Sequence, residues 1–190
     1  MVEKRYKSDL LRFKYINHYL HGKDILDIGS NEGYLHKLLK GKNPDKNFFT
    51  LDNTGSPNFK TDLDNPKKIN MKFDTIIAGE IIEHVESPIR FIRYCKGLLK
   101  NNGRIILTTP NATGIQYMRN PGWCVYYKEY RGHTQTFTID MLKRIFSDEG
   151  FKVLYTDYVN AFWINNPLEY FSLVFKRLRP DLIIVADKNK

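Results

Sequence analysis

Cysteines and long hydrophobic runs are both scarce in this sequence, and each scarcity argues against a class of protein. There are two cysteines among 190 residues, Cys95 and Cys124, and they are too far apart to form a Cys-x-x-Cys motif. A disulfide-stapled fold and a cysteine zinc site are therefore not expected. No apolar run approaches the roughly 18 residues that a membrane-spanning helix needs. Residues 1–11 are charged and lack the apolar stretch of a signal peptide, so the sequence predicts a cytoplasmic protein.

The chain carries an excess of positive charge, with a formal net charge of +9. This excess is compatible with solubility alone, but it also suits an anionic partner such as RNA, a phosphorylated substrate or a membrane surface. The basic residues form no long block, which leaves these alternatives open. A hydrophobic fraction of 42% with 14% aromatic residues is typical of a folded domain rather than a disordered chain. No feature of the sequence indicates an oligomeric state.

Helical and strand-like patterns alternate along the chain, which predicts one α/β domain over residues 1–190. The short apolar runs are typical of strands buried on both faces, so we expect a doubly wound, mostly parallel sheet with helices on both faces. An amphipathic helix over 8–20, within an N-terminal helical region 1–22, precedes the first strand. The expected strands are residues 24–28, 48–51, 58–61, 73–78, 104–109, 151–155 and 182–186, and the expected later helices are 34–39, 88–99 and 139–149.

One long segment, residues 110–137, has no clear periodicity. Long loops in compact domains are usually functional, so we expect this segment to face the substrate. The alternative is a surface loop whose aromatic side chains stabilise the fold. Those aromatic residues are Tyr117, Trp123, Tyr126, Tyr127 and Tyr130.

A glycine-rich turn at residues 29–33 follows the first expected strand. In open α/β sheets, ligands bind outside the carboxyl ends of the strands, where this turn would lie. Asn31 breaks the G-x-G-x-x-G dinucleotide pattern, and Tyr34 stands where a phosphate-binding loop needs lysine. Asp27 and Glu32 would repel a pyrophosphate, whereas Asp52, at the end of the next strand, suits the hydroxyls of a ribose. The turn therefore indicates a nucleoside ligand without a phosphate chain.

These segments together resemble the motifs of class I S-adenosylmethionine-dependent methyltransferases. The resemblance includes the glycine turn, the acidic residue after the second strand, the segments 73–80 and 98–111, and the late helix and strand after His133. It implies a seven-stranded Rossmann-like sheet whose last strand, 182–186, is antiparallel. It also implies S-adenosylmethionine as cofactor, bound by Asp27, Gly29, Ser30, Asn31, Gly33, Tyr34, Asp52, Asn53, Asp62, Leu63 and Gly79.

A Glu-x-x-Glu-His segment follows the fourth expected strand, with Glu80, Glu83 and His84 as its polar residues. If this segment is helical, all three side chains share one face. His84 then acts as a general base or substrate contact assisted by the two glutamates, which is the role we favour. Two alternatives stay open: a divalent metal site that adds His133, and a purely structural capping role. The segment resembles those of quinone-biosynthesis O-methyltransferases and of small-RNA 2′-O-methyltransferases.

The resemblance as a whole implies an enzyme, a methyltransferase that uses S-adenosylmethionine. We expect O-methylation of a small-molecule acceptor such as a quinone, sugar or glycolipid precursor, without a metal. One alternative is an RNA 2′-O-methyltransferase with a divalent metal at Glu80, Glu83, His84 and His133. The other is an S-adenosylmethionine-binding module without catalysis. The sequence leaves nitrogen or carbon open as the acceptor atom.

Overall fold

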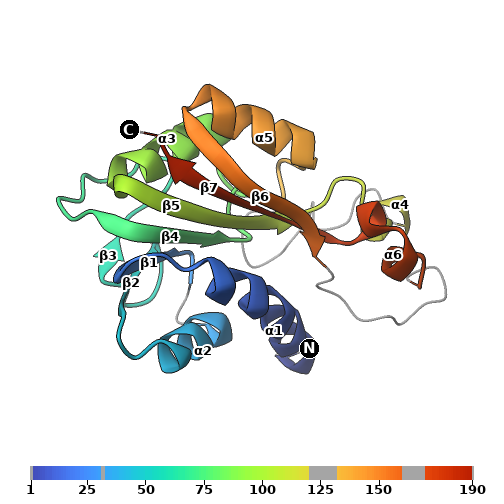
Figure 1. The fold of residues 1–190 in the computed structure, drawn as a ribbon, viewed down its shortest axis with the longest axis horizontal. Coiled ribbons are helices and arrows are strands. Elements are labelled where there is room, and N and C mark those ends of the chain that lie inside the picture. Colours follow the sequence, from blue (N-terminus) through green and yellow to red (C-terminus); the bar gives the residue numbers. More distant parts are fainter. Residues whose placement is uncertain (1, 31–32, 120–131, 160–169, 190) are drawn as a thin grey trace.

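A computed structural model describes residues 2–30, 33–119, 132–159 and 170–189 of the chain, and its centre is a seven-stranded sheet (Figure 1). The strands lie in the order β3-β2-β1-β4-β5-β7-β6. Their bounds are Asp24–Ile28 (β1), Asn47–Asp52 (β2), Phe59–Lys60 (β3), Phe73–Gly79 (β4), Leu99–Pro110 (β5), Phe151–Val159 (β6) and Asp181–Lys188 (β7). The helices are α1 (Val2–Tyr19), α2 (Tyr34–Lys42), α3 (Pro88–Leu98), α4 (Ile115–Arg119), α5 (Ile139–Asp148) and α6 (Phe171–Val174), with a 3₁₀ turn η2 (Lys176–Leu178).

Strands β1 to β5 pair in parallel, whereas β7 pairs antiparallel with both β5 and β6. The expected doubly wound, mostly parallel sheet with an antiparallel last strand is therefore confirmed. The central strands read as apolar runs because they are buried on both faces: Ile25, Leu26 and Ile76 are fully covered. Antiparallel β7 begins at the edge of the sheet where the parallel strands end, which brings Asp181 to that edge.

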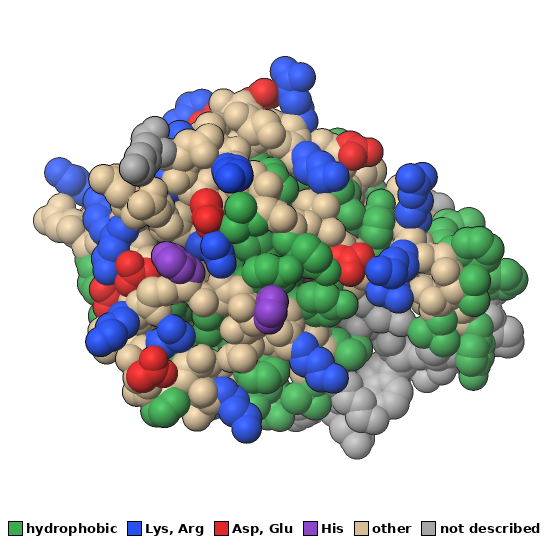
Figure 2. Space-filling model, in the orientation of Figure 1, with side chains coloured by type: hydrophobic (Ala, Val, Ile, Leu, Met, Phe, Trp, Pro, Cys, Tyr) green, Lys and Arg blue, Asp and Glu red, His purple; other side chains and the backbone are tan. Residues whose placement is uncertain are grey.

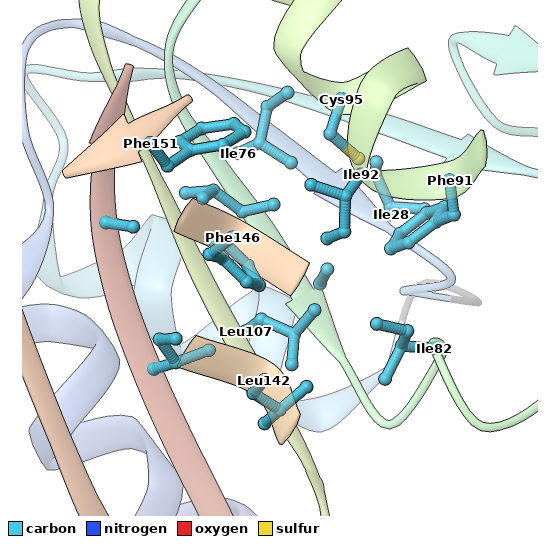
Figure 3. Close-up of a cluster of buried hydrophobic side chains, with 14 of the residues drawn as sticks. Ile28, Ile76, Ile82, Phe91, Ile92, Cys95, Leu107, Leu142, Phe146 and Phe151 are labelled. Carbon is cyan, nitrogen blue, oxygen red and sulfur yellow. The ribbon is translucent and has the colours of Figure 1, made fainter. Parts of the chain in front are cut away.

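Helices cover both faces of the sheet, with α1 and α2 on one side and α3 and α5 on the other (Figure 1). The larger core lies under α3 and α5, where Phe91 and Phe146 pack toward Ile76 and Leu107 (Figure 3). A smaller core lies under α1 and α2 and includes Ile16, Leu39 and Ile25. These four helices therefore bury the apolar stripes that cover the sheet.

The helix ends follow the chemistry of their capping residues. Pro88 occupies the first turn of α3, and the Ser87 side chain accepts a hydrogen bond from the Arg90 backbone N–H. Thr138 caps α5 in the same way, by accepting from the Met141 N–H. Gly150 follows α5 with φ at 73°, a left-handed conformation that favours glycine. The expected roles of Pro88, Thr138 and Gly150 are confirmed.

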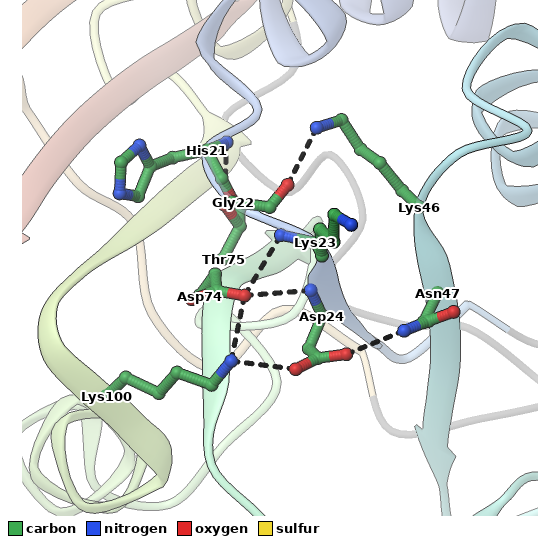
Figure 4. A network of polar contacts seen from close by, with 9 residues as sticks. All are labelled: His21, Gly22, Lys23, Asp24, Lys46, Asn47, Asp74, Thr75 and Lys100. Atoms are coloured by element: carbon green, nitrogen blue, oxygen red, sulfur yellow. Dashed lines mark hydrogen bonds and ion pairs between the residues drawn. The ribbon is translucent and has the colours of Figure 1, made fainter.

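A network of polar contacts ties the chain together at the amino edge of the sheet (Figure 4). The Asp74 carboxylate accepts hydrogen bonds from the backbone N–H groups of Lys23 and Asp24 and from the Lys100 side chain. Gly22 has φ at 67°, and a Cβ there would lie 2.2 Å from the Asp74 Cβ. Asp74 therefore fixes the entry into β1, at the edge of the sheet opposite the glycine turn.

The structure differs from the sequence expectations in several places. The expected turn before the fifth strand, residues 101–103, lies within β5, where Leu99 pairs with Phe73 and the register then shifts. Asn102 takes φ at 60° there. The residues expected to form a turn before the strand therefore form an irregularity inside it. The N-terminal helix ends at Tyr19, and the segment expected to be a loop from 110 to 137 contains α4. No helix of the described residues is long and apolar enough to cross a membrane.

Candidate functional site

The candidate site lies at the carboxyl edge of the sheet, where loops from several strands are bonded together. The Gly29 backbone N–H donates to the Leu51 carbonyl oxygen at 2.8 Å, and the Glu80 N–H donates to the Thr108 carbonyl oxygen at 2.9 Å. The turn after β1, the end of β2, and the ends of β4 and β5 are thus held beside one another. In an α/β sheet this edge is the place where a ligand meets the protein.

The glycine turn after β1 depends on glycine itself. Gly29 has φ at 69°, and a Cβ at this position would lie 2.0 Å from the Cδ1 atom of Ile81. Gly33 donates its N–H to the Ser30 carbonyl oxygen at 2.7 Å and directly precedes Tyr34, the first residue of α2. Asn31 lies outside the described residues. The tight turn leaves room for a ligand to approach the backbone closely.

A cavity of about 270 Å³ opens beside this turn. Its lining is rich in hydroxyl groups and includes one carboxylate: Ser30, Thr50, Asp52, Thr54, Gly55, Ser56 and Pro57. The Ser30 hydroxyl is buried and has no hydrogen-bond partner among the described residues. One oxygen of Asp52 accepts hydrogen bonds from the N–H and hydroxyl of Thr54, both at 3.0 Å, which orients the carboxylate. Because this lining contains no basic residue, it fits a ribose better than a phosphate.

Asp27 is held beneath the turn rather than among the residues that line the cavity. Its carboxylate oxygen lies 2.9 Å from Nδ1 of His36 on α2, and both residues are buried. This pair links β1 to α2 and so holds the two sides of the glycine turn together. The sequence patterns did not single out His36, because a histidine inside a short helix carries no signal of its partner.

The remaining expected cofactor residues lie around the same edge. The Asp52 carbonyl oxygen accepts from the Thr61 N–H at 3.0 Å, so Asp62, which follows, is anchored near β2. Asp62 is exposed, and one of its oxygens accepts from the Asp64 N–H. Leu63 packs against the larger core. The other positions are Asn53, exposed after β2; Tyr34, partly exposed at the start of α2; and Gly79, at the end of β4.

Glu80 ends β4 in an unusual conformation and pairs with the N-terminal helix. Its φ of 57° is uncommon for a residue with a side chain and stores strain at this point. One oxygen of Glu80 lies 3.1 Å from Nη1 of Arg12 on α1. Residues 80–84 are not helical, because this left-handed residue turns the chain and α3 begins only at Pro88. Glu80 consequently does not share a helical face with Glu83 and His84.

Glu83, His84 and His133 nevertheless come together. One ligand atom from each of the three lies within 4.8 Å of the others. The Glu83 Oε1 atom lies 3.9 Å from Nε2 of His84, and the two histidine rings meet edge to face at 4.8 Å between centroids. The backbone joins them as well, since the Thr134 N–H donates to the Glu83 carbonyl oxygen. His133 therefore lies beside the segment after β4 although the two are about fifty residues apart in the chain, a proximity that the alternative metal site requires.

Burial changes the ionisation of this group. Glu83 is 1% exposed, and burial together with the nearby Glu80 charge raises its pKa well above the ordinary value. Its Oε2 atom accepts a hydrogen bond from the Thr109 hydroxyl at 2.9 Å. Burial and the neighbouring His84 lower the pKa of His133 to about 4, so its imidazole is neutral at physiological pH. Nδ1 of His133 lies 3.4 Å from the Tyr117 hydroxyl oxygen, a contact between the two described ends of the segment 110–137.

Asp181, which the sequence patterns did not single out, adds a third carboxylate to the pair Glu80 and Glu83. It is 2% exposed, and burial with the Glu80 charge raises its pKa well above the ordinary value. Several buried polar atoms around it have no hydrogen-bond partner among the described residues. They are Glu83 Oε1, Thr108 Oγ1, Gln116 Oε1 and Asp181 Oδ1. Buried polar atoms are normally satisfied, so this concentration indicates a place for a polar ligand or for water.

The family of the fold follows from a comparison with known proteins. Residues 2–156 match the family model described as "Methyltransferase domain". Among curated proteins, the ubiquinone biosynthesis O-methyltransferase of Glaesserella parasuis is 29% identical over 137 residues, which cover 57% of this chain and 55% of that protein. The corresponding protein of Coxiella burnetii is 27% identical over 124 residues, which cover 57% of this chain and 53% of the relative. The chain thus spans about half the length of these relatives.

Solved structures agree on the architecture. A methyltransferase in complex with the Haloferax volcanii Trm112 activator superposes with a TM-score of 0.71 at 14% identity, over 99% of this chain and 94% of that one. An S-adenosylmethionine-dependent methyltransferase from Archaeoglobus fulgidus gives a TM-score of 0.67 at 18% identity, over 97% and 94% of the two chains. At such low identity these similarities establish the fold, and the site must be argued from its own residues.

Proposed function

Because this chain belongs to the methyltransferase domain family, we propose that it transfers a methyl group from S-adenosylmethionine to a hydroxyl oxygen of a small acceptor. The observation that carries the proposal is the position of His84, which lies beside buried Glu83 at the same edge of the sheet as the glycine turn. A quinol, sugar or glycolipid precursor is the acceptor class that we favour. The curated relatives, named as ubiquinone biosynthesis O-methyltransferases, support an aromatic hydroxyl.

The residues around the turn fit the cofactor. The oriented Asp52 carboxylate would accept hydrogen bonds from the two ribose hydroxyls, and the buried Ser30 hydroxyl would gain a partner. Arg12, which approaches the end of β4 from α1, is the cation that would meet the carboxylate of the methionine part. When bound, the cofactor supplies a methyl group on a positively charged sulfur. The protein's main contribution is then to hold donor and acceptor in line.

The acceptor oxygen must lose its proton as it attacks, and we assign that proton to His84. Nε2 of His84 faces Glu83, so Nδ1 would take the proton and Glu83 would stabilise the resulting imidazolium. Methyl transfer would then leave a methyl ether on the acceptor, a neutral thioether in place of the sulfonium, and the proton on His84. Nδ1 of His133 and the Tyr117 hydroxyl oxygen lie 3.4 Å apart, and these two side chains would contact the acceptor from the described ends of the segment 110–137.

A second candidate is methylation of an RNA 2′-hydroxyl with the help of a divalent metal. The observation in its favour is the group of Glu83, His84 and His133, whose ligand atoms lie within 4.8 Å of one another. The net charge of +9 also favours a polyanionic substrate. Glu80, expected as a fourth ligand, lies against Arg12 instead, which leaves this candidate in second place.

Calorimetric titration with S-adenosylmethionine and, separately, with NAD tests the cofactor. We expect binding of the first and none of the second; failure to bind S-adenosylmethionine would refute the proposal. A mass-spectrometric screen of catechols, sugars and short RNAs then identifies the acceptor. His84→Ala should lose turnover while retaining cofactor binding. His21→Ala removes an exposed histidine at the opposite edge of the sheet and should change neither property.

Two further outcomes have a definite meaning. Cofactor binding without turnover on any acceptor, in the wild type as in His84→Ala, would favour a binding module without catalysis. Steep loss of substrate binding with salt would favour RNA over a small acceptor. We propose that the reaction takes place in the cytoplasm; Cys95, a free and fully buried thiol, is in keeping with a reducing compartment.

A further inference from the structure

A cluster of exposed apolar side chains lies on α6 and the residues beside it. Tyr170 is 60% exposed, Phe171 51%, Val174 75% and Phe175 56%, and Leu173 between them is also exposed. Figure 2 shows hydrophobic side chains gathered at the end of the molecule where Figure 1 places α6. Single exposed apolar residues are ordinary, but a contiguous group of aromatic and aliphatic side chains usually marks a binding surface.

Basic residues follow this apolar group directly. Lys176 and Arg177 are both exposed, and the segment 170–180 contains no acidic residue. An oxygen of Asp157 lies 3.8 Å from the ammonium nitrogen of Lys176, whose own side chain is 63% exposed. Aromatic side chains beside cationic ones match a lipid interface, where rings enter the boundary of the acyl chains and cations meet the phosphates. A protein partner would require no such separation of apolar and basic groups.

Side chains hold the end of this segment to the body of the protein by hydrogen bonds to backbone carbonyl oxygens. The Asn111 side chain donates to the carbonyl oxygens of Arg177 and Arg179, and the Gln116 side chain donates to the carbonyl oxygen of Pro180. The Arg179 guanidinium donates to the carbonyl oxygen of Tyr158 at 3.1 Å. The apolar side chains are thus presented on an anchored turn, so little ordering is needed before they bind.

We propose that residues 170–177 dock the protein on a membrane surface that contains anionic lipid. Phe171, Val174 and Phe175 enter the interface, and Lys176 and Arg177 bind the lipid phosphates. The anchoring residue Asn111 follows β5 just after Thr109, the hydrogen-bond donor to Glu83, so docking places the acceptor side of the site close to the bilayer. The inference goes beyond methyl transfer and does not depend on it.

Flotation with lipid vesicles tests the docking surface. The full chain is mixed with phosphatidylcholine vesicles, with or without phosphatidylglycerol, and the protein that floats with lipid is measured. We expect strong binding only with phosphatidylglycerol, weakened by added salt. Replacing both Phe171 and Phe175 with serine should lower the partition coefficient at least about tenfold. Replacing Lys176 and Arg177 with glutamine should remove the preference for anionic lipid.

Matched controls use residues exposed elsewhere. Ile89→Ser on α3 and Lys68→Gln in the loop after β3 change the same kinds of side chain and should leave flotation unchanged. Unchanged flotation in the Phe171/Phe175 variant, or no flotation of the wild type, overturns the proposal. So does concentration-dependent self-association in gel filtration that the same variant abolishes, because the surface would then belong to a second copy. Cofactor titration of each variant reports folding and is independent of lipid.

Discussion

Nη1 of Arg12, on the N-terminal helix, lies 3.1 Å from a carboxylate oxygen of Glu80 at the end of β4. The two residues are distant in the chain, and Arg12 is largely buried, with a side chain 11% exposed against 28% for Glu80. The contact attaches α1 to a strand end whose backbone is itself strained, at φ 57°. The N-terminal helix is thereby part of the site rather than an appendage.

The first prediction is that Arg12 and Glu80 are energetically coupled. Glu80→Gln removes the carboxylate that lies against a mostly buried guanidinium and should lower the free energy of unfolding by roughly 1–3 kcal/mol. Adding Arg12→Met should restore part of that loss, because the guanidinium that loses this contact is then gone. A double-mutant cycle by urea denaturation measures the coupling. Strictly additive effects would show that the pair contributes nothing to stability.

The second prediction concerns Gly29. Gly29→Ala should destabilise the protein by about 1–3 kcal/mol and weaken S-adenosylmethionine binding at least about tenfold, because φ is positive and the new methyl group meets Ile81. Adding Ile81→Ala should relieve the clash but not the backbone strain. Gly41→Ala on α2 is the control, since a Cβ there meets nothing within 4 Å. Equal effects of the two alanine substitutions would contradict the argument.

Much of this architecture follows from local sequence signals. The apolar runs predict the buried strands, Pro88 and Thr138 predict helix starts, and the glycine turn with Asp52 predicts the edge of the sheet where the cavity lies. These signals are local because each depends on a few neighbouring residues. Asn102 shows their limit: the turn chemistry is present, but pairing of Leu99 with Phe73 draws the residues into β5. At this position, pairing between strands overrides the local preference of the sequence for a turn.

The residues on the acceptor side of the candidate site could be predicted from the sequence only in part. Glu83, His84 and His133 lie close together, but residues 80–84 do not form the helix that would have placed Glu80 on the same face as Glu83 and His84. Arg12 and Asp181 carry no motif at all. Asp181 has one indirect signal: the first residue of an antiparallel strand must lie at the edge where its parallel neighbours end. Arg12 has no such signal in the sequence, because its contact with Glu80 depends on how α1 packs against the sheet.

The third prediction concerns acid stability. Hydrogen bonds from the Asn47 and Lys100 side chains lower the pKa of Asp24 below its ordinary 3.8. The unfolded chain then binds a proton more readily than the folded one, so this stabilisation is present above about pH 4 and is lost as the pH falls through the lower folded pKa. Asn47→Ala should therefore reduce the loss of stability on acidification, with Asn70→Ala as an exposed control. Urea denaturation from pH 5 downward, at about half-unit steps, measures the difference. Identical pH profiles would contradict this role for Asn47.

The fourth prediction concerns the polar network at the amino edge of the sheet. Asp74→Ala leaves the backbone N–H groups of Lys23 and Asp24 without their acceptor, which should lower the free energy of unfolding by about 1–3 kcal/mol. Because Asp74 lies at the edge opposite the glycine turn, the affinity for S-adenosylmethionine of the folded protein should not change. Titration at a temperature well below the unfolding midpoint separates the two effects. A large loss of affinity there would place Asp74 in the site.

The last prediction decides between the two roles of Glu83, His84 and His133. Their ligand atoms are close enough to surround one ion, and His133, with a pKa of about 4, is neutral as a metal ligand must be. One feature favours the role without metal: Glu80, the fourth ligand that the metal alternative requires, lies against Arg12 instead. We therefore expect methyl transfer to continue in a chelator and to be unchanged by added magnesium or manganese. Activity that a chelator abolishes and either ion restores would assign the three residues to a metal, and with it would favour the RNA 2′-hydroxyl as acceptor.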